Sequence, residues 1–290
     1  MNEDQRRELI ETRFSRPQAI AEAAAARRPH APLGATEQLL IVAADHTARG
    51  MMGIGRDPMA MANRYDLLER LRVALSNPGV NGVLGTPDII EDLLLLGALE
   101  NKVVFGSMNR GGIPGSVFEL DDRFGSFTTQ SLVENGYDGG KMLLRINYAD
   151  TGTADTLAAC ADAVTQLAAA KKIAMIEPFM NETSNGRHVN VLTPDAVIHS
   201  MAISSALGAT SAYSWLKVPV VDDMARVVEA TTLPIVLLGG ERHDNPDEMY
   251  RSWADALALP GVRGLTVGRN LLYPLDDDVE GAVKTAVSLL

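Results

Sequence analysis

Short runs of valine, isoleucine and leucine recur from about residue 38 onward. Each run is followed by a turn signal and then by apolar positions at helical spacing. We expect eight of these runs to be strands: 39–44, 82–84, 103–106, 142–146, 173–176, 214–218, 235–238 and 264–267. The stretches between them are expected to be helices, at 59–75, 89–99, 154–170, 194–207, 222–230 and 247–257. Regular alternation of strands and helices is typical of parallel strands joined by crossover helices.

Eight strand–helix units favour an α/β fold with a single closed (β/α)8 TIM barrel over an open sheet. Thr193-Pro194-Asp195 has the residue types of a helix start, with Thr193 as the cap and Pro194 in the first turn. The barrel domain is predicted to span residues 38–290, after an N-terminal helical extension of residues 1–37. That extension contains an alanine-rich helical tract, 19–27, which we expect to pack on the outside or bottom of the barrel.

Composition and charge narrow the class of partner. The chain has 290 residues, 46% of them hydrophobic, which is enough for a large core. Its net charge of -11 argues against nucleic acid and anionic membranes, while a small anionic metabolite stays compatible with a local cationic pocket. No run of about 20 apolar residues is present, and the charged N-terminus lacks the apolar core of a signal peptide, so we expect a cytoplasmic protein. Cys160, the single cysteine, is expected to be a packed helix residue.

Lys217 lies midway along an apolar strand, in A-Y-S-W-L-K-V-P-V-V. Burial disfavours an ammonium and shifts lysine toward the neutral amine, which is the form that attacks a carbonyl to give a Schiff base. The alternative is a lysine whose stem lies on apolar surface while its ammonium reaches water.

Further ionisable residues are expected at the carboxyl ends of the strands, where TIM barrels collect their active sites. Asp45 follows the first strand, Glu177 ends the fifth, and Lys141 and Arg145 share the inward face of the fourth by alternation. With Lys217 as nucleophile, Lys141 would help to keep it neutral, Glu177 would move protons, and Asp45 would orient a lysine or a substrate hydroxyl. The competing interpretation is a structural ion pair between Glu177 and Lys141, with Asp45 capping a loop.

Glycine turns end the last two expected strands, in L-L-G-G-E-R (Leu237 to Arg242) and L-T-V-G-R-N (Leu265 to Asn270). Barrels commonly bind phosphate at this position through backbone N–H groups. We therefore predict a phosphate site at Gly239, Gly240, Gly268 and Arg269, against the alternative of ordinary turn glycines.

The histidines do not show metal-ligand spacing, so we predict no metal, and we expect no cofactor. The alternative is a metal site formed by His46, His188 and His243, which fall on rim loops that could meet in space, whereas His199 falls within an expected helix. The segments 109–115 and 181–188 are expected to be long rim loops, either lids or plain surface excursions.

Four motifs resemble a known family. A-D-H-T-A-R-G, K-M-L-L-R-I-N-Y, I-E-P-F and W-L-K-V-P are similar to motifs of class I, Schiff-base aldolases of the deoxyribose-phosphate, archaeal-type fructose-bisphosphate and tagatose-bisphosphate group. The likeness extends from Leu39 to about Tyr273. It implies Lys217 as the Schiff-base lysine, Glu177 as proton shuttle, Lys141 as an assisting cation, and a phosphate at Gly240, Gly268 and Arg269.

Arg145 departs from the tagatose enzymes, which tend to have an uncharged aromatic residue there, and an extra guanidinium favours a second anionic group such as a carboxylate. The chain looks most similar to aldolases of actinobacterial inositol catabolism, which implies cleavage of 6-phospho-5-dehydro-2-deoxy-gluconate to dihydroxyacetone phosphate and malonate semialdehyde. Two alternatives stay open: a phosphate-binding barrel isomerase or decarboxylase without an imine, and a non-catalytic metabolite sensor. We expect a homo-oligomer, since such barrels are often symmetric assemblies.

Overall fold

The computed structural model describes residues 1–34, 37–109, 112–184, 186–240 and 244–290. Eight parallel strands follow one another round a closed barrel, and β1 pairs with β9 to complete it. They are β1 (Leu39–Ala43), β2 (Gly82–Gly85), β3 (Val103–Ser107), β4 (Gly139–Ile146), β5 (Ile173–Ser184), β7 (Ser214–Pro219), β8 (Ile235–Leu238) and β9 (Val262–Val267). The predicted TIM barrel is confirmed.

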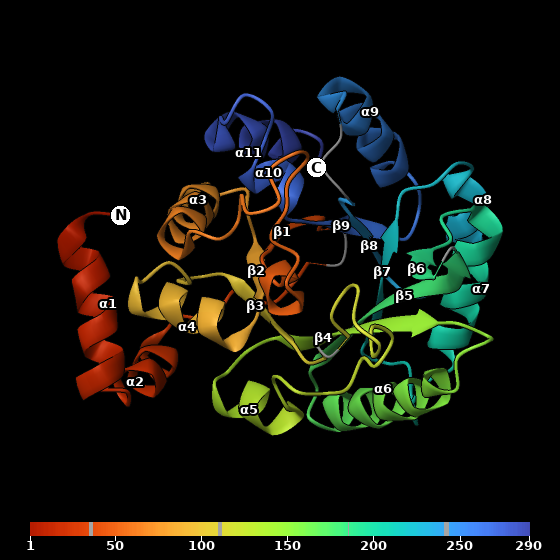
Figure 1. The fold of residues 1–290 in the computed structure, drawn as a ribbon, viewed down its shortest axis with the longest axis horizontal. Helices are drawn as coiled ribbons and strands as arrows, with labels where there is room; N and C mark the ends of the chain where they lie inside the picture. Colours follow the sequence, from red (N-terminus) through yellow and green to blue (C-terminus); the bar gives the residue numbers. More distant parts are fainter. Residues whose placement is uncertain (35–36, 110–111, 185, 241–243) are drawn as a thin grey trace.

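Helices surround the strands in a ring (Figure 1). They are α3 (Arg64–Ser76), α4 (Pro87–Leu95), α5 (Thr129–Glu134), α6 (Gly152–Ala169), α7 (Pro194–Ser205), α8 (Met224–Glu229), α9 (Pro246–Leu257), α10 (Arg269–Leu272) and α11 (Val279–Val287), with a 3-10 turn η1 (His46–Arg49) after β1. Thr193 caps α7 as predicted, accepting a hydrogen bond from the Ala196 N–H. The helix expected over 59–75 begins only at Arg64, because the Asn63 side chain caps the chain there.

Residues 181–188 do not form the expected open loop. Strand β5 continues to Ser184 and pairs antiparallel with β6 (Arg187–Asn190), so this segment is a β-hairpin at the barrel mouth. Asn185 lies outside the described residues. The sequence predicts an end to the fifth strand at 176 because the polar residues further along have the composition of a loop.

Side chains alternate between two apolar layers along each strand. Leu40 and Val42 of β1 belong to the shell between the strands and the helices. Leu39 and Ile41 belong to a smaller cluster that fills the barrel interior together with residues such as Phe105 of β3. This interior cluster closes the lower part of the barrel, and the inward positions nearer the carboxyl ends of the strands carry the polar groups.

Two helices precede the barrel, α1 (Glu3–Ser15) and α2 (Ala19–Ala26), and both lie outside α4 (Figure 1). Arg13 of α1 pairs with Asp92 of α4 at 2.8 Å. Arg27, just after α2, donates to the carbonyl oxygens of Lys102 and Gly136, each at 2.8 Å. Helix α1 falls in the predicted helical extension, but no separate helix was predicted over its residues, most of which are polar.

In the part of the chain that the structure describes, no helix is both long enough and apolar enough to cross a membrane.

Candidate active site

Four ionisable side chains meet inside the barrel above the interior apolar cluster. Lys217 of β7 and Glu177 of β5 point inward, since their neighbours Leu216 and Ile176 belong to the outer shell. Lys141 of β4 is inward for the same reason, and Asp45 lies two residues after the end of β1. The strand bounds differ in part from prediction, because β5 continues well past Glu177 and β4 begins at Gly139 rather than at 142.

The four groups form a continuous chain of ion pairs. Lys217 Nζ donates to Glu177 Oε1 at 2.7 Å, and Lys141 Nζ contacts the other carboxylate oxygen of Glu177, Oε2. Lys141 Nζ also donates to Asp45 Oδ2 at 3.2 Å, and that oxygen accepts a further bond from Ser107 Oγ at 3.3 Å. Lys141 therefore bridges two carboxylates, while Lys217 pairs with Glu177.

Burial governs the protonation of Lys217, whose residue is 3% exposed. Desolvation lowers the pKa of its ammonium, the nearby positive charge of Lys141 lowers that pKa further, and the carboxylates of Glu177 and Asp45 oppose the change. The net direction is downward. The site therefore favours the neutral amine more than water does.

Glu177 is affected in the opposite sense by the same surroundings. Burial by itself would raise the pKa of its carboxyl group, but the ammonium groups of Lys141 and Lys217 outweigh that effect and lower the pKa to about 2. Glu177 is consequently a carboxylate at neutral pH and accepts hydrogen bonds.

These side chains line a cavity of about 730 Å³ at the mouth of the barrel. All nine predicted site residues border it: Asp45, Lys141, Arg145, Glu177, Lys217, Gly239, Gly240, Gly268 and Arg269. The β5–β6 hairpin contributes Asn181, His188 and Asn190 to its wall, and the segment after β3 contributes Pro114 and Glu119. Both segments predicted at the rim therefore border the cavity, although Arg110 and Gly111 lie outside the described residues.

Glycine occurs after β8 and β9 for different structural reasons. A Cβ atom on Gly268 would lie 2.1 Å from the Ala43 carbonyl oxygen, and one on Gly239 would lie 2.4 Å from Val267 Cγ1. Both positions thus require glycine for packing. Gly240 has a φ of +66°, and a Cβ atom there would have no described atom within 4 Å, so the missing side chain leaves open space.

Gly239, Gly240 and Gly268 form a glycine corner at the ends of β8 and β9, and two side chains donate hydrogen bonds to it. Asn270 Nδ2 donates to the Gly239 carbonyl oxygen at 2.7 Å, and Arg269 Nη2 donates to the Gly240 carbonyl oxygen at 3.2 Å. Asn270 belongs to the V-G-R-N motif, but no role was predicted for it. Glu241, Arg242 and His243 lie outside the described residues.

Arg145 does border the cavity, but its guanidinium is already engaged. Asp122, buried in the segment between β3 and α5, accepts from Arg145 Nε at 2.8 Å and from Nη2 at 2.6 Å. The Glu119 carbonyl oxygen accepts from Nη2 as well. The expectation that this residue offers an extra cation to the substrate assumed an unpaired guanidinium, and the bidentate pair with Asp122 removes that premise.

The histidines are dispersed over the molecule. His46 and His188 border the cavity, whereas His199 lies on α7 beside a second hollow. Within the described ranges, no group of three or more histidine, cysteine, aspartate and glutamate side chains is arranged to hold a metal ion. Cys160 is buried in α6, as predicted, and burial raises the pKa of its thiol to about 12.

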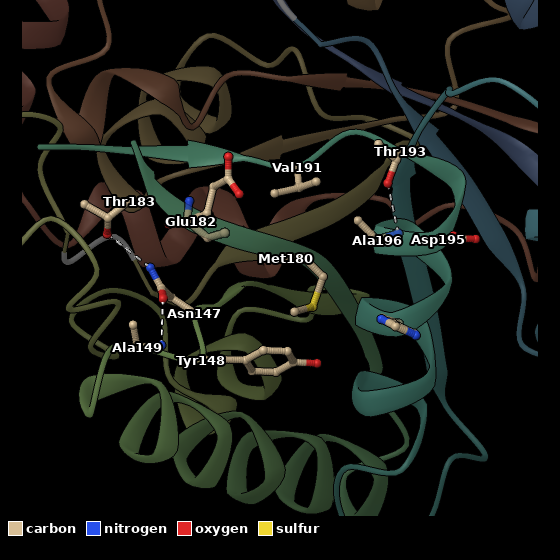
Figure 2. A pocket seen from close by; sticks show the side chains of 12 residues that line it. Asn147, Tyr148, Ala149, Met180, Glu182, Thr183, Val191, Thr193, Asp195 and Ala196 are labelled. Carbon is tan, nitrogen blue, oxygen red and sulfur yellow. Dashed lines mark hydrogen bonds between the residues drawn. The ribbon is translucent and has the colours of Figure 1, made fainter. Parts of the chain in front are cut away.

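The second hollow, of about 500 Å³, lies between the ends of β4 and β5 and the start of α7 (Figure 2). Asn147 holds one side of it, donating to Thr183 Oγ1 at 3.4 Å and accepting from the Ala149 N–H at 2.9 Å. Its described lining carries the carboxylates of Glu182 and Asp195 but neither lysine nor arginine. The buried lysines Lys141 and Lys217 therefore border the barrel cavity and not this hollow.

Comparison with known proteins places the chain in a family. The Cgl0159-like family model matches residues 37–287. The chain belongs to the Cgl0159-like family. Cgl0159 from Corynebacterium glutamicum, known from a crystal structure, has 53% sequence identity to this chain. The match covers 100% of this chain and 97% of that one, with a TM-score of 0.97. No curated protein matches the sequence.

More distant structures share the fold of this Cgl0159-like protein. A Schiff base forming fructose-1,6-bisphosphate aldolase has a TM-score of 0.66 at 17% identity, over 93% of this chain and 99% of that one. An archaeal fructose-1,6-bisphosphate aldolase, with its catalytic lysine covalently bound to a carbinolamine intermediate, has a TM-score of 0.66 at 15% identity over 93% and 98%. The chain therefore shares the barrel fold of these two aldolases.

Proposed function

We propose that this Cgl0159-like protein is a class I aldolase that cleaves or forms a carbon–carbon bond in a phosphorylated keto-sugar through a Schiff base on Lys217. The observation that carries the proposal is the inward, buried Lys217 amine hydrogen-bonded to Glu177 at 2.7 Å. The two aldolase structures named above support it, because one is described as Schiff base forming and the other holds a carbinolamine on its lysine.

The first step is attack by the neutral amine of Lys217 on the substrate carbonyl carbon. The carbinolamine loses water to give an iminium ion, which takes up the electron pair of the carbon–carbon bond as that bond breaks. The other fragment leaves as an aldehyde, and its hydroxyl proton goes to Glu177. The fragment retained on Lys217 is then an enamine, which is protonated on carbon and hydrolysed to free the amine. A lowered pKa of Lys217 serves the first step, since an ammonium has no lone pair.

Glu177 is the group placed to handle protons at Lys217. Because its pKa is held near 2, it begins the cycle as a carboxylate and acts first as an acceptor. It takes a proton from the nitrogen while the amine adds to the carbonyl and returns it to the carbinolamine oxygen. Uptake of one further proton from solvent then lets that oxygen leave as water. The 2.7 Å contact puts that transfer within direct hydrogen-bond reach.

Lys141 assists without touching the imine carbon. Its positive charge lowers the pKa of Lys217 and keeps Glu177 ionised. Asp45 holds its ammonium in place from the other side, and Ser107 in turn donates a hydrogen bond to Asp45. In this interpretation the Lys141–Glu177 pair is structural and also sets the protonation of the two groups that react.

A phosphate group is proposed to bind at Gly239, Gly240, Gly268 and Arg269, at the carboxyl ends of β8 and β9 where barrels commonly bind phosphate. The open space at Gly240 and the Arg269 side chain support this placement. The packing reasons found for Gly239 and Gly268 mean that these glycines do not by themselves point to a ligand.

The substrate proposal is a phosphorylated ketose, with keto-sugar acids as a second group to assay. Asp122 already balances the charge of Arg145, so the charge argument for a carboxylate on the substrate loses its support. The resemblance to inositol-catabolism aldolases still makes 6-phospho-5-dehydro-2-deoxy-gluconate one compound to include.

A product assay tests this function. A panel of phosphorylated ketoses and keto-sugar acids is incubated with the protein, and release of dihydroxyacetone phosphate is measured. We expect turnover of at least one compound, loss of turnover in Lys217→Ala and Lys217→Arg, and normal turnover in Lys284→Ala, whose side chain is exposed on α11. Full activity in Lys217→Arg would contradict the imine, because a guanidinium polarises an oxygen but does not form a Schiff base.

A further inference from the structure

Thr266 of β9 is a polar residue of the cavity that the proposed reaction does not use. Its neighbours Leu265 and Val267 belong to the outer shell, so alternation directs Thr266 inward. It borders the same cavity as Lys217, and its residue is 1% exposed. Its register partners on the adjacent strands are Leu238 and Ile41, both apolar.

The Thr266 hydroxyl has no hydrogen-bond partner within the described part of the chain. An unpaired hydroxyl at a buried position costs free energy, whereas valine has the same shape and the same preference for strands. The neighbouring ionisable groups do have partners: Lys217 pairs with Glu177, and Lys141 with Asp45. The fold therefore gains nothing from this hydroxyl, which points to a ligand atom as its partner.

The strand register places Thr266 between the reacting lysine and the glycine corner. In the strand register, Lys217 lies opposite Val236 of β8. Thr266 lies opposite Leu238 of the same strand, which is one inward position nearer the carboxyl ends of the strands. Gly239 directly follows Leu238, and Gly268 follows Thr266 by two residues. A molecule with its carbonyl at Lys217 and its phosphate at the glycine corner passes the Thr266 side chain.

We propose that the Thr266 hydroxyl hydrogen-bonds an oxygen of the three-carbon phosphorylated ketone unit that is held by Lys217, and so helps to select that unit. This inference rests on the proposed function. The oxygen is either the free hydroxyl beside the carbonyl or an oxygen of the phosphate ester, and these two partners are separable by experiment.

The experiment compares Thr266→Val, Thr266→Ser and the native protein by calorimetric titration with three probes. Dihydroxyacetone phosphate carries both groups, hydroxyacetone phosphate lacks the free hydroxyl, and dihydroxyacetone lacks the phosphate. We expect Thr266→Val to bind dihydroxyacetone phosphate roughly five- to tenfold more weakly, which is the usual worth of one neutral hydrogen bond. Thr266→Ser, which keeps the hydroxyl, should bind it within about twofold of the native protein.

The probe whose affinity does not change in Thr266→Val identifies the partner, because that probe lacks the group to which the hydroxyl binds. Unchanged binding of hydroxyacetone phosphate assigns the free hydroxyl, and unchanged binding of dihydroxyacetone assigns the phosphate ester. Either pattern supports the proposal. Equal affinity of Thr266→Val and native protein for dihydroxyacetone phosphate overturns it, and so does an equal loss for all three probes, which would indicate altered packing.

Borohydride treatment of the same samples separates this proposal from the aldolase assignment. Native protein that binds dihydroxyacetone phosphate but is not trapped contradicts the imine and leaves the role of Thr266 to be decided by the affinities. Trapping with no effect of Thr266→Val contradicts the role of Thr266 alone. Native protein that does not bind dihydroxyacetone phosphate contradicts both. Thermal unfolding of Thr266→Val should occur at the native temperature or higher, since a methyl group replaces an unpaired hydroxyl.

Discussion

Lys217 Nζ and Glu177 Oε1 lie 2.7 Å apart inside the barrel, at residues that are 3% and 8% exposed. The pair differs from an ordinary buried ion pair because a second ammonium, that of Lys141, contacts the other oxygen of the same carboxylate. Glu177 is thus held firmly ionised, while Lys217 is the member whose charged form is disfavoured.

This arrangement predicts opposite pH shifts for two variants. The rate constant kcat/KM should rise with pH as Lys217 loses its proton. Lys141→Gln removes a neighbouring positive charge, so the pKa of Lys217 rises. The rising part of the pH profile, here called the limb, then moves to higher pH. Glu177→Gln removes a negative charge, so the limb moves to lower pH, and the maximal rate falls by about 100-fold or more because the proton acceptor is lost.

The measurement is a pH profile of kcat/KM for the three proteins, with Lys284→Gln as the control for loss of an exposed lysine. Shifts of both variants in the same direction would show that Lys217 does not set the limb.

The two kinds of glycine should respond differently to alanine. Gly268→Ala forces a Cβ atom against the Ala43 carbonyl oxygen and should lower the free energy of unfolding by about 1–3 kcal/mol. Gly240→Ala, at positive φ in open space, should cost about 1 kcal/mol and weaken phosphate binding. Urea unfolding and titration with inorganic phosphate measure both effects. Undiminished phosphate affinity in a folded Gly240→Ala variant would argue against an anion at this corner.

The Arg145–Asp122 pair should be structural. Asp122→Asn leaves the buried guanidinium poorly balanced and should destabilise the protein by about 3 kcal/mol, and Arg145→Met combined with Asp122→Asn should recover part of that loss. The exposed pair Arg226–Asp195 is the matched control, where Arg226→Met should cost under about 1 kcal/mol. A KM that rises in Arg145→Met for keto-acids, but not for ketoses, would instead restore a direct role in binding a carboxylate.

Arg27 should anchor the N-terminal helices. It is 7% exposed and donates to two carbonyl oxygens, so Arg27→Ala should lower the free energy of unfolding by about 3 kcal/mol. Arg28→Ala, at an exposed pair with Glu100, should cost under about 1 kcal/mol. Thermal unfolding measures the difference, and equal losses would show that Arg27 does not anchor these helices.

The barrel was predictable because buried parallel strands leave short apolar runs at regular spacing, and all eight strands overlap the predicted ranges. Period-two alternation likewise predicted the inward faces that carry Lys141 and Lys217. The bounds of helix α1 within the N-terminal extension were not predicted, since its packing depends on few apolar residues and on ion pairs such as Arg13 with Asp92. The β5–β6 hairpin was missed because its polar residues have the composition of a loop.

The partners of the site residues were less accessible to sequence reasoning. Asp122 lies 23 residues before Arg145 in an irregular segment, where no periodicity links the two. Ser107 and Thr266 look like ordinary strand residues, and only the register of the closed barrel places them beside Asp45 and the cavity. Asn270 had a signal in its glycine motif, but its amide's contact with the Gly239 carbonyl depends on the fold.

The most direct measurement of the central claim is borohydride reduction in the presence of dihydroxyacetone phosphate, followed by peptide mass mapping. A secondary amine adduct on Lys217, absent from Lys217→Ala and present in Lys284→Ala, is the predicted result. An adduct on another lysine, or turnover without any trapped adduct, would contradict an imine at Lys217.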